Sequence, residues 1–190
     1  MRPLGEVLGK TGISPNMVTL ISVGVSAVSC YYFALSNLLL GAFCAILAGV
    51  IDMFDGAVAR ATGKASPYGA VFDHVMDRYA EFFMVFGIGL SIYADTWISF
   101  VCLFSMIMAS FTRAKAESVG GLKQCTVGIA ERQEKLGILL GSVFLTYLFP
   151  SIILSGFTIL EIGLFLIALL SQITVLQRLN YTRTQQSVIT

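Results

Sequence analysis

The chain has 190 residues, of which 56% are hydrophobic and 12% are charged, and its mean hydropathy is +0.84. Soluble domains carry about twice that share of charge, so the composition excludes an ordinary soluble domain, and we expect no nucleic-acid partner. The net charge of +1 says little by itself. The length leaves no room for a second domain beside the apolar segments, so we expect one membrane domain over residues 1–190.

The first residues of the chain, 1–12, mix apolar and charged side chains. This pattern fits a short amphipathic helix lying on the membrane surface, and a disordered tail is the alternative. The first apolar run begins after Pro15 and shows no small-residue cleavage site. We therefore expect no cleaved signal peptide, because the first span can serve as its own insertion signal.

Six apolar segments follow, and a spanning helix needs about 20 residues. Their predicted bounds are 16–35, 38–62, 69–93, 96–118, 131–149 and 155–178. Turn-forming residues separate the segments, including Gly120-Gly121 and Pro150-Ser151. The sequence therefore predicts an all-α fold, an integral membrane bundle of six transmembrane helices with an N-terminal juxtamembrane amphipathic helix.

The basic residues gather on one side of this predicted topology. They lie before the first span, at or beside the second and fourth connections, and at the end of the chain: Arg2, Lys10, Arg60, Lys64, Arg78, Arg113, Lys115, Lys123, Arg132, Lys135, Arg178 and Arg183. The three opposite connections hold no lysine or arginine. By the positive-inside rule, we expect a multi-pass protein of the cell membrane with both termini on the cytoplasmic side.

Four aspartates interrupt the apolar sequence of the second and third predicted spans. Residues three, four and seven apart share one face of a helix. The second span thereby presents Asp52, Asp55, Gly56 and Ala59 on one stripe, and the third presents Gly69, Asp73 and Asp77. The short connection makes the two spans antiparallel, so we expect the carboxylates to converge near the cytoplasmic surface. Because unpaired charges are costly in a membrane, this predicts a bound divalent cation.

The donor set indicates which cation this site would hold. Hard oxygen ligands, with no nearby cysteine and a single histidine, favour Mg²⁺ or Mn²⁺ over zinc. We expect two ions, since one ion would leave much negative charge uncompensated. Gly56, Ala59 and Gly69 leave room for a ligand, although ordinary small-residue packing is the alternative. A channel, a proton relay and a structural charge network also bury acids, but phosphate chemistry on a metal accounts best for the mixture.

The pattern Asp-x2-Asp-Gly-x2-Ala-Arg-x8-Gly-x3-Asp-x3-Asp occupies residues 52–77. It resembles the signature of the CDP-alcohol phosphotransferase family, with every fixed position present. The predicted six-helix plan and the Pro15-Asn16-Met-Val-Thr19 entry into the first span extend the resemblance over most of the chain. The resemblance implies a metal-dependent transfer from a CDP-linked donor to an alcohol, with release of CMP, in a homodimer embedded in the lipid bilayer.

The same resemblance implies roles by position. Asp52, Asp55 and Asp73 would bind metal, and Asp77 would complete the metal site and serve as the general base. The residues implied to contact the donor nucleotide or its phosphates, or to leave room for them, are Asn16, Thr19, Gly56, Ala59, Arg60 and Gly69. Two neighbours lie outside the signature. One helical step rotates His74 away from the aspartate stripe, which favours packing or support over catalysis, and Glu81 would orient a ligand or pair with a base on the fourth span.

Lys115, Arg132 and Arg178 lie at the cytoplasmic ends of the last three predicted spans. They would form an anion site if they converge near the metal pocket, and the alternative is that they anchor helices at the headgroup level. The surrounding segments resemble the subgroup of phosphatidylinositol phosphate and archaetidylinositol phosphate synthases, with a departure at Lys135, where relatives often carry arginine. This implies an inositol phosphate acceptor, its phosphate held by the three cations, and CDP-diacylglycerol or CDP-archaeol as the donor.

Other functions stay open at this point. Glycerol 3-phosphate as the acceptor would make the chain a phosphatidylglycerol phosphate synthase, and CDP-inositol as a soluble donor would make it a di-inositol phosphate phosphate synthase. A divalent-cation transporter is the alternative from another class. Transport needs ligands across the membrane depth, whereas the outer half holds only Asp95 and Glu161.

Overall fold

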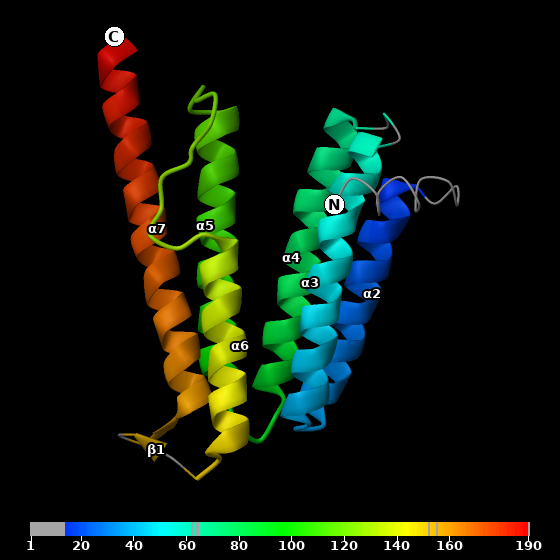
Figure 1. The fold of residues 1–190 in the computed structure, drawn as a ribbon. Helices are drawn as coiled ribbons and strands as arrows, with labels where there is room; N and C mark the ends of the chain where they lie inside the picture. The colour runs from blue at the N-terminus through cyan, green and yellow to red at the C-terminus, as the bar shows by residue number, and fades with distance from the viewer. Residues whose placement is uncertain (1–13, 62, 64, 152, 155, 190) are drawn as a thin grey trace. The chain divides into compact units, whose positions relative to one another are not determined.

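The computed structural model describes residues 14–61, 63, 65–151, 153–154 and 156–189. Six helices occur in these ranges (Figure 1), and they are α2 Pro15–Ala34, α3 Leu38–Ala61, α4 Pro67–Gly89, α5 Thr96–Ser118, α6 Arg132–Leu148 and α7 Ile159–Ile189. Two short strands, β1 Ile153–Leu154 and β2 Phe157–Thr158, pair antiparallel. The predicted amphipathic helix over residues 1–12 lies outside the described residues.

Each of the six predicted apolar segments forms a helix, and α7 departs most from its predicted bounds. The last segment was expected over 155–178, but a hairpin turning at Gly156 with φ +87° precedes the helix, which runs from Ile159 to Ile189. A positive φ of this size favours glycine. The helix also continues beyond residue 178. Apolar composition predicts only the part of a helix that is buried in lipid, and polar residues can continue the helix beyond that part.

Four helices are long and apolar enough to cross a bilayer, over Pro15–Ala34, Leu38–Ala59, Thr96–Ser118 and Ile159–Gln185. The other two depart from that standard for visible reasons. Helix α4 includes four charged residues between Asp73 and Glu81, and α6 has 17 residues and opens with several charges. The chain is therefore helical, apart from its one short hairpin among the described residues, and multi-pass, while the six-span arrangement stays a prediction.

The chain divides into two compact units, Met1–Ser91 and Ile92–Thr190, which are described separately. In the first, α2 packs against both α3 and α4. The Ser22 hydroxyl donates to the Ala48 carbonyl oxygen at 2.9 Å, and the Ser29 hydroxyl donates to the Gly41 carbonyl oxygen at 2.7 Å. A Cβ added to Gly87 of α4 would lie 2.5 Å from the Cys30 carbonyl oxygen. Only glycine therefore permits this approach of α4 to α2.

In the second unit, α7 packs against α5 and α6. The Gln172 side-chain amide donates to the Ser105 hydroxyl at 3.1 Å, which joins α7 to α5. At the other end of α7, the Glu161 carboxylate accepts from the backbone N–H of Asp95 at 2.9 Å and of Thr158 at 2.8 Å. These contacts fix the start of α5 and the hairpin against the start of α7.

Candidate active site

The candidate site lies where α2 and α4 begin and α3 ends. Ser14 caps α2 and Pro15 opens it, and Ser66 and Pro67 do the same for α4. This combination is a strong start signal, because the serine satisfies a free backbone donor and proline needs none. The Gly69 N–H donates to the Ser66 hydroxyl at 3.0 Å. The cap thus sets the register that places Gly69, Asp73 and Asp77 on successive turns.

The structure brings the four aspartates into two groups that share Asp73. One carboxylate oxygen from each of Asp52, Asp55 and Asp73 lies within 4.8 Å of the others. Asp73 and Asp77 also form a group with a ring nitrogen of His74 within the same limit. Asp52, Asp55 and Asp73 are half-buried, and Asp77 is 7% exposed. The convergence of α3 and α4 carboxylates expected from their spacing is therefore present, with Asp73 belonging to both groups.

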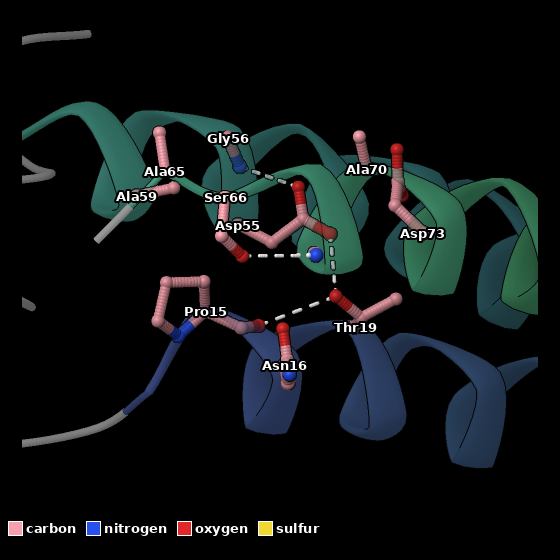
Figure 2. Close-up of a pocket in the computed structure, with 11 residues that line it drawn as sticks. Pro15, Asn16, Thr19, Asp55, Gly56, Ala59, Ala65, Ser66, Ala70 and Asp73 are labelled. Carbon is pink, nitrogen blue, oxygen red and sulfur yellow. Dashed lines mark hydrogen bonds between the residues drawn. The ribbon is translucent and has the colours of Figure 1, made fainter.

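Asp55 is held from two sides (Figure 2). The Thr19 hydroxyl of α2 donates to Asp55 Oδ2 at 2.7 Å, and the Gly56 N–H contacts Asp55 Oδ1. The same hydroxyl lies 3.2 Å from the Pro15 carbonyl oxygen. Its single proton favours the nearer, charged acceptor. Thr19 therefore orients a carboxylate of the cluster, a different contact from the nucleotide contact that the family resemblance implies.

A cavity of about 230 Å³ adjoins the cluster. Its lining residues are Pro15, Asn16, Thr19, Asp55, Gly56, Ala59, Ala65, Ser66, Gly69, Ala70 and Asp73. Five of the six residues implied to serve the donor nucleotide are among them. The sixth, Arg60, lies in the last turn of α3, and its side chain is outside the described part of the chain.

Small side chains keep this cavity open. Gly56, Ala59, Ala65, Gly69 and Ala70 contribute at most one methyl group each to its wall. A Cβ added to Gly69 would lie 3.2 Å from the Ser66 hydroxyl oxygen and 3.8 Å from Asn16 Oδ1. A larger side chain at position 69 would thus extend into the space between α2 and α4.

Several lining residues were not singled out from the sequence, among them Ser66, Ala65 and Ala70. The Ser66-Pro67 pair could have been recognised as a helix start with its hydroxyl at the pocket. His74 is exposed rather than packed, and a ring nitrogen lies within 4.8 Å of carboxylate oxygens of Asp73 and Asp77, so of the two expected roles the supporting one stays a prediction. Glu81 pairs with Arg78 of its own helix at 2.9 Å, and the same guanidinium lies 3.9 Å from Asp77 Oδ2.

The donor set fits a hard divalent cation. Three carboxylate oxygens within 4.8 Å of one another repel strongly when all are ionised, and a cation between them removes that repulsion. Mg²⁺ and Mn²⁺ prefer oxygen ligands, often with phosphate oxygens completing the sphere. The cluster and the open cavity beside it therefore provide both the ligands and the space for a phosphate-bearing molecule.

The three predicted acceptor cations all belong to the second unit. Lys115 is exposed near the end of α5, with its Nζ 5.6 Å from the centre of the Phe111 ring, and Arg132 is the half-buried first residue of α6. Arg178 of α7 is 7% exposed. Its Nε donates to the Val127 carbonyl oxygen at 2.9 Å, and its Nη1 donates to the Ala109 carbonyl oxygen at 2.6 Å.

Arg178 thus joins α5, α7 and the segment between α5 and α6, a role that sequence reasoning did not identify. Lys115 lines a separate, mainly apolar groove of about 420 Å³ between α5 and α7. The groove includes Phe111, Val175 and Leu179, and neither predicted arginine lines it. Convergence of the three cations near the aspartate cluster stays a prediction.

Apolar helices of spanning length and a carboxylate cluster open to a cavity define an integral membrane protein with a candidate divalent-metal site. The profile of the CDP-alcohol phosphatidyltransferase family matches residues 12–176, and the chain belongs to this family. The chain is therefore a transferase, and the resemblance of residues 52–77 to the signature of this family is confirmed.

The chain is 34% identical to the archaetidylinositol phosphate synthase of Pyrococcus horikoshii over 175 residues, covering 92% of this chain and 86% of that protein. Its fold is similar to that of Mycobacterium tuberculosis phosphatidylinositol phosphate synthase in two crystal structures, each at 29% identity. The structure with CDP-DAG bound has a TM-score of 0.82 over 95% of this chain and 92% of that one. The structure in complex with manganese and citrate has a TM-score of 0.83 over 96% and 88%.

Proposed function

We propose that this chain transfers the phosphatidyl or archaetidyl group from a CDP-linked lipid to an inositol phosphate, with release of CMP, in phospholipid biosynthesis. The observation that carries the proposal is the convergence of carboxylates from α3 and α4 beside an open cavity. Family membership supports the reaction class. The named relatives, which are inositol phosphate lipid synthases, support the acceptor and the lipid donor.

Asp52, Asp55, Asp73 and Asp77 would hold Mg²⁺ or Mn²⁺, as two ions. When bound, the metal supplies charge neutralisation to the diphosphate and to the CMP leaving group. The predominance of carboxylate oxygens supports this assignment, as does the similarity to a synthase that was crystallised with manganese.

Other residues of the first unit would bind the CDP-linked donor or leave room for it. Asn16, Gly56, Ala59 and Gly69 bound the cavity that would receive the nucleotide, with no bulky side chain in its way. Arg60 would contact a phosphate of the donor. Thr19 holds Asp55 in one orientation, so the carboxylate need not reorganise when the donor binds.

Asp77 would act as the general base. Its carboxylate is nearly buried, and the Arg78 guanidinium lies 3.9 Å from Oδ2. A carboxylate close to the bound metal would stay ionised, which is the state that can accept a proton from the attacking inositol hydroxyl. The attack is productive when that hydroxyl is held in line with the bond to the leaving CMP.

Lys115, Arg132 and Arg178 would bind the phosphate of the acceptor. A neutral acceptor such as serine needs no such set of cations, whereas a phosphomonoester does. Two of the guanidinium nitrogens of Arg178 are engaged by carbonyl oxygens, so Nη2 is the nitrogen that would meet the anion. Helix anchoring by the same residues is the competing explanation.

In the membrane, all six helices would cross the bilayer, with both termini and the aspartate cluster on the cytoplasmic side. The one-sided distribution of lysine and arginine supports this orientation. The CDP-lipid would enter sideways between helices, with its acyl or isoprenoid chains remaining in the bilayer. Two copies of the protein would form a homodimer.

A cation transporter is not favoured. Asp95 and Glu161, at the starts of α5 and α7, cap helices rather than form a second carboxylate cluster.

The test is release of CMP by the purified protein in lipid nanodiscs. CDP-diacylglycerol, CDP-archaeol and CDP-inositol are each offered with inositol phosphate, glycerol 3-phosphate or serine, in Mn²⁺ or Mg²⁺ and again in excess EDTA. We expect metal-dependent CMP release with a CDP-lipid and inositol phosphate. Preference for glycerol 3-phosphate would overturn the acceptor assignment, full activity with CDP-inositol would overturn the donor assignment, and turnover in EDTA would overturn the metal assignment.

Arg132→Ala tests the acceptor site separately. Loss of a charge-assisted contact costs about 1.5–3 kcal/mol, so the KM for inositol phosphate should rise by about 10- to 100-fold. The KM for the CDP-lipid should stay within about twofold of the unmodified protein. Equal increases for both substrates would indicate that Arg132 anchors its helix.

A further inference from the structure

The segment between α5 and α6, residues 119–131, contains neither helix nor strand. Irregular connections of this length are uncommon in compact domains and are usually functional. This one ends at Glu131, immediately before Arg132 opens α6. The path of the segment therefore determines where the Arg132 side chain starts.

Side chains of the neighbouring helices hold the segment at three alternate residues. The Glu117 carboxylate of α5 accepts from the Cys125 N–H at 2.9 Å. Arg178 of α7 donates through Nε to the Val127 carbonyl oxygen at 2.9 Å. The third contact is made by the Gln177 side-chain carbonyl oxygen, which accepts from the Ile129 N–H at 3.0 Å.

The segment is also packed closely against α7. A Cβ added to Gly128 would lie 2.7 Å from the Thr174 methyl carbon, so the backbone touches the helix where a side chain would not fit. Cys125 is 0% exposed and Ala130 is 2% exposed. The residues that precede Arg132 are thus fixed by hydrogen bonds and by contact.

We propose that Gln177 is a positioning residue for the acceptor: by holding Ile129, it places Arg132 where the phosphate of the incoming alcohol binds. Its contact is three residues before Arg132, whereas the Glu117 contact is seven residues before it. Gln177 also directly precedes Arg178 on α7. One turn of this helix would therefore both bind the anion, through Arg178, and position Arg132, through Gln177. The inference rests on the proposed function of Arg132.

The experiment uses the full chain in nanodiscs and compares Gln177→Leu with Gln177→Glu. Leucine has a similar size and no acceptor, so the Ile129 N–H loses its partner, and the KM for inositol phosphate should rise about tenfold. The KM for CDP-diacylglycerol and the rate at saturating inositol phosphate should stay within about twofold. Gln177→Glu retains an acceptor oxygen for the Ile129 N–H, so its KM for inositol phosphate should stay within about twofold of the value for the unmodified protein.

Gln172→Leu is the matched control. It makes the same substitution on the same helix and removes the hydrogen bond to Ser105 of α5, without touching the segment before α6. We expect both KM values to stay within about twofold. If Gln177→Leu is not recovered folded, Gln177→Asn replaces it, since shortening the side chain by one methylene withdraws the same oxygen.

A double-mutant cycle distinguishes positioning from general stability. If Gln177 acts through Arg132, then Gln177→Leu should change the KM for inositol phosphate by less than about twofold in an Arg132→Ala background. A full tenfold effect in that background, an unchanged KM in the single variant, or equal increases for donor and acceptor would each overturn the inference. Failure of the proposed function itself would appear separately, as absence of CMP release by the unmodified chain with inositol phosphate.

Discussion

Replacing Thr19 by valine should weaken divalent-metal binding while leaving the fold intact. The Thr19 hydroxyl donates to Asp55 Oδ2 at 2.7 Å, and valine has a similar shape but no donor, so the variant removes this hydrogen bond with little change in packing. A hydrogen bond to a charged group contributes about 1.5–3 kcal/mol. Since 1.4 kcal/mol is a factor of about ten, the affinity for Mn²⁺ should fall by about 10- to 100-fold, the range typical of residues that orient metal ligands.

The measurement is a Mn²⁺ titration followed by the paramagnetic resonance signal of the free ion, which needs no turnover. Two variants serve as controls. Thr19→Ser keeps the hydroxyl and should bind like the unmodified protein. Ser22→Ala removes a hydrogen bond between the same two helices, one turn away and to a neutral carbonyl oxygen, and should leave the affinity unchanged. Unaltered Mn²⁺ affinity in Thr19→Val would refute the view that Asp55 is a metal ligand oriented by Thr19.

Asp77→Asn should lower CMP release by at least about a hundredfold, because an amide cannot accept the proton of the attacking hydroxyl; gel filtration and circular dichroism should match the unmodified protein, and normal turnover would remove Asp77 from its role. Gly69→Leu should raise the KM for the CDP-lipid by about tenfold, as overpacking costs about 1–3 kcal/mol, with little change in the KM for inositol phosphate. Gly49→Leu on α3, where an added Cβ meets nothing within 4 Å, is its control, and equal KM values for the two variants would contradict the placement of the donor.

Periodicity accounts for what could be predicted from the sequence. Runs of apolar residues between turn signals predicted each of the six helices in the described residues, since a membrane demands continuous hydrogen-bonded spans. The three-, four- and seven-residue spacing of the aspartates predicted their common faces, and the short connection predicted that α3 and α4 would bring them together. Each of these inferences uses residues close in sequence or joined by a short turn.

The remaining contacts depend on how helices are rotated against one another, which periodicity does not specify. Thr19 and Asp55 are 36 residues apart, and Arg178 and Val127 are 51 residues apart. A threonine in an apolar helix has many available partners, including its own backbone, so its bond to Asp55 had no signal in the sequence. His74 shows a related limit, since helical angle alone did not predict that its ring nitrogen would lie within 4.8 Å of carboxylate oxygens of Asp73 and Asp77.

Ser22 and Ser29 of α2 donate to main-chain oxygens of α3, those of Ala48 and Gly41, rather than to side chains. Every amino acid supplies such an oxygen, so the acceptor is retained whatever residue occurs at positions 48 and 41, provided that it is small enough. Co-variation between the contacting positions of α2 and α3 should therefore be weak although the two helices touch there. A search for co-varying pairs would miss this junction. A protein engineer could choose the residue at position 48 by size alone, but position 41 accepts only glycine, because an added Cβ would overlap the Phe33 ring.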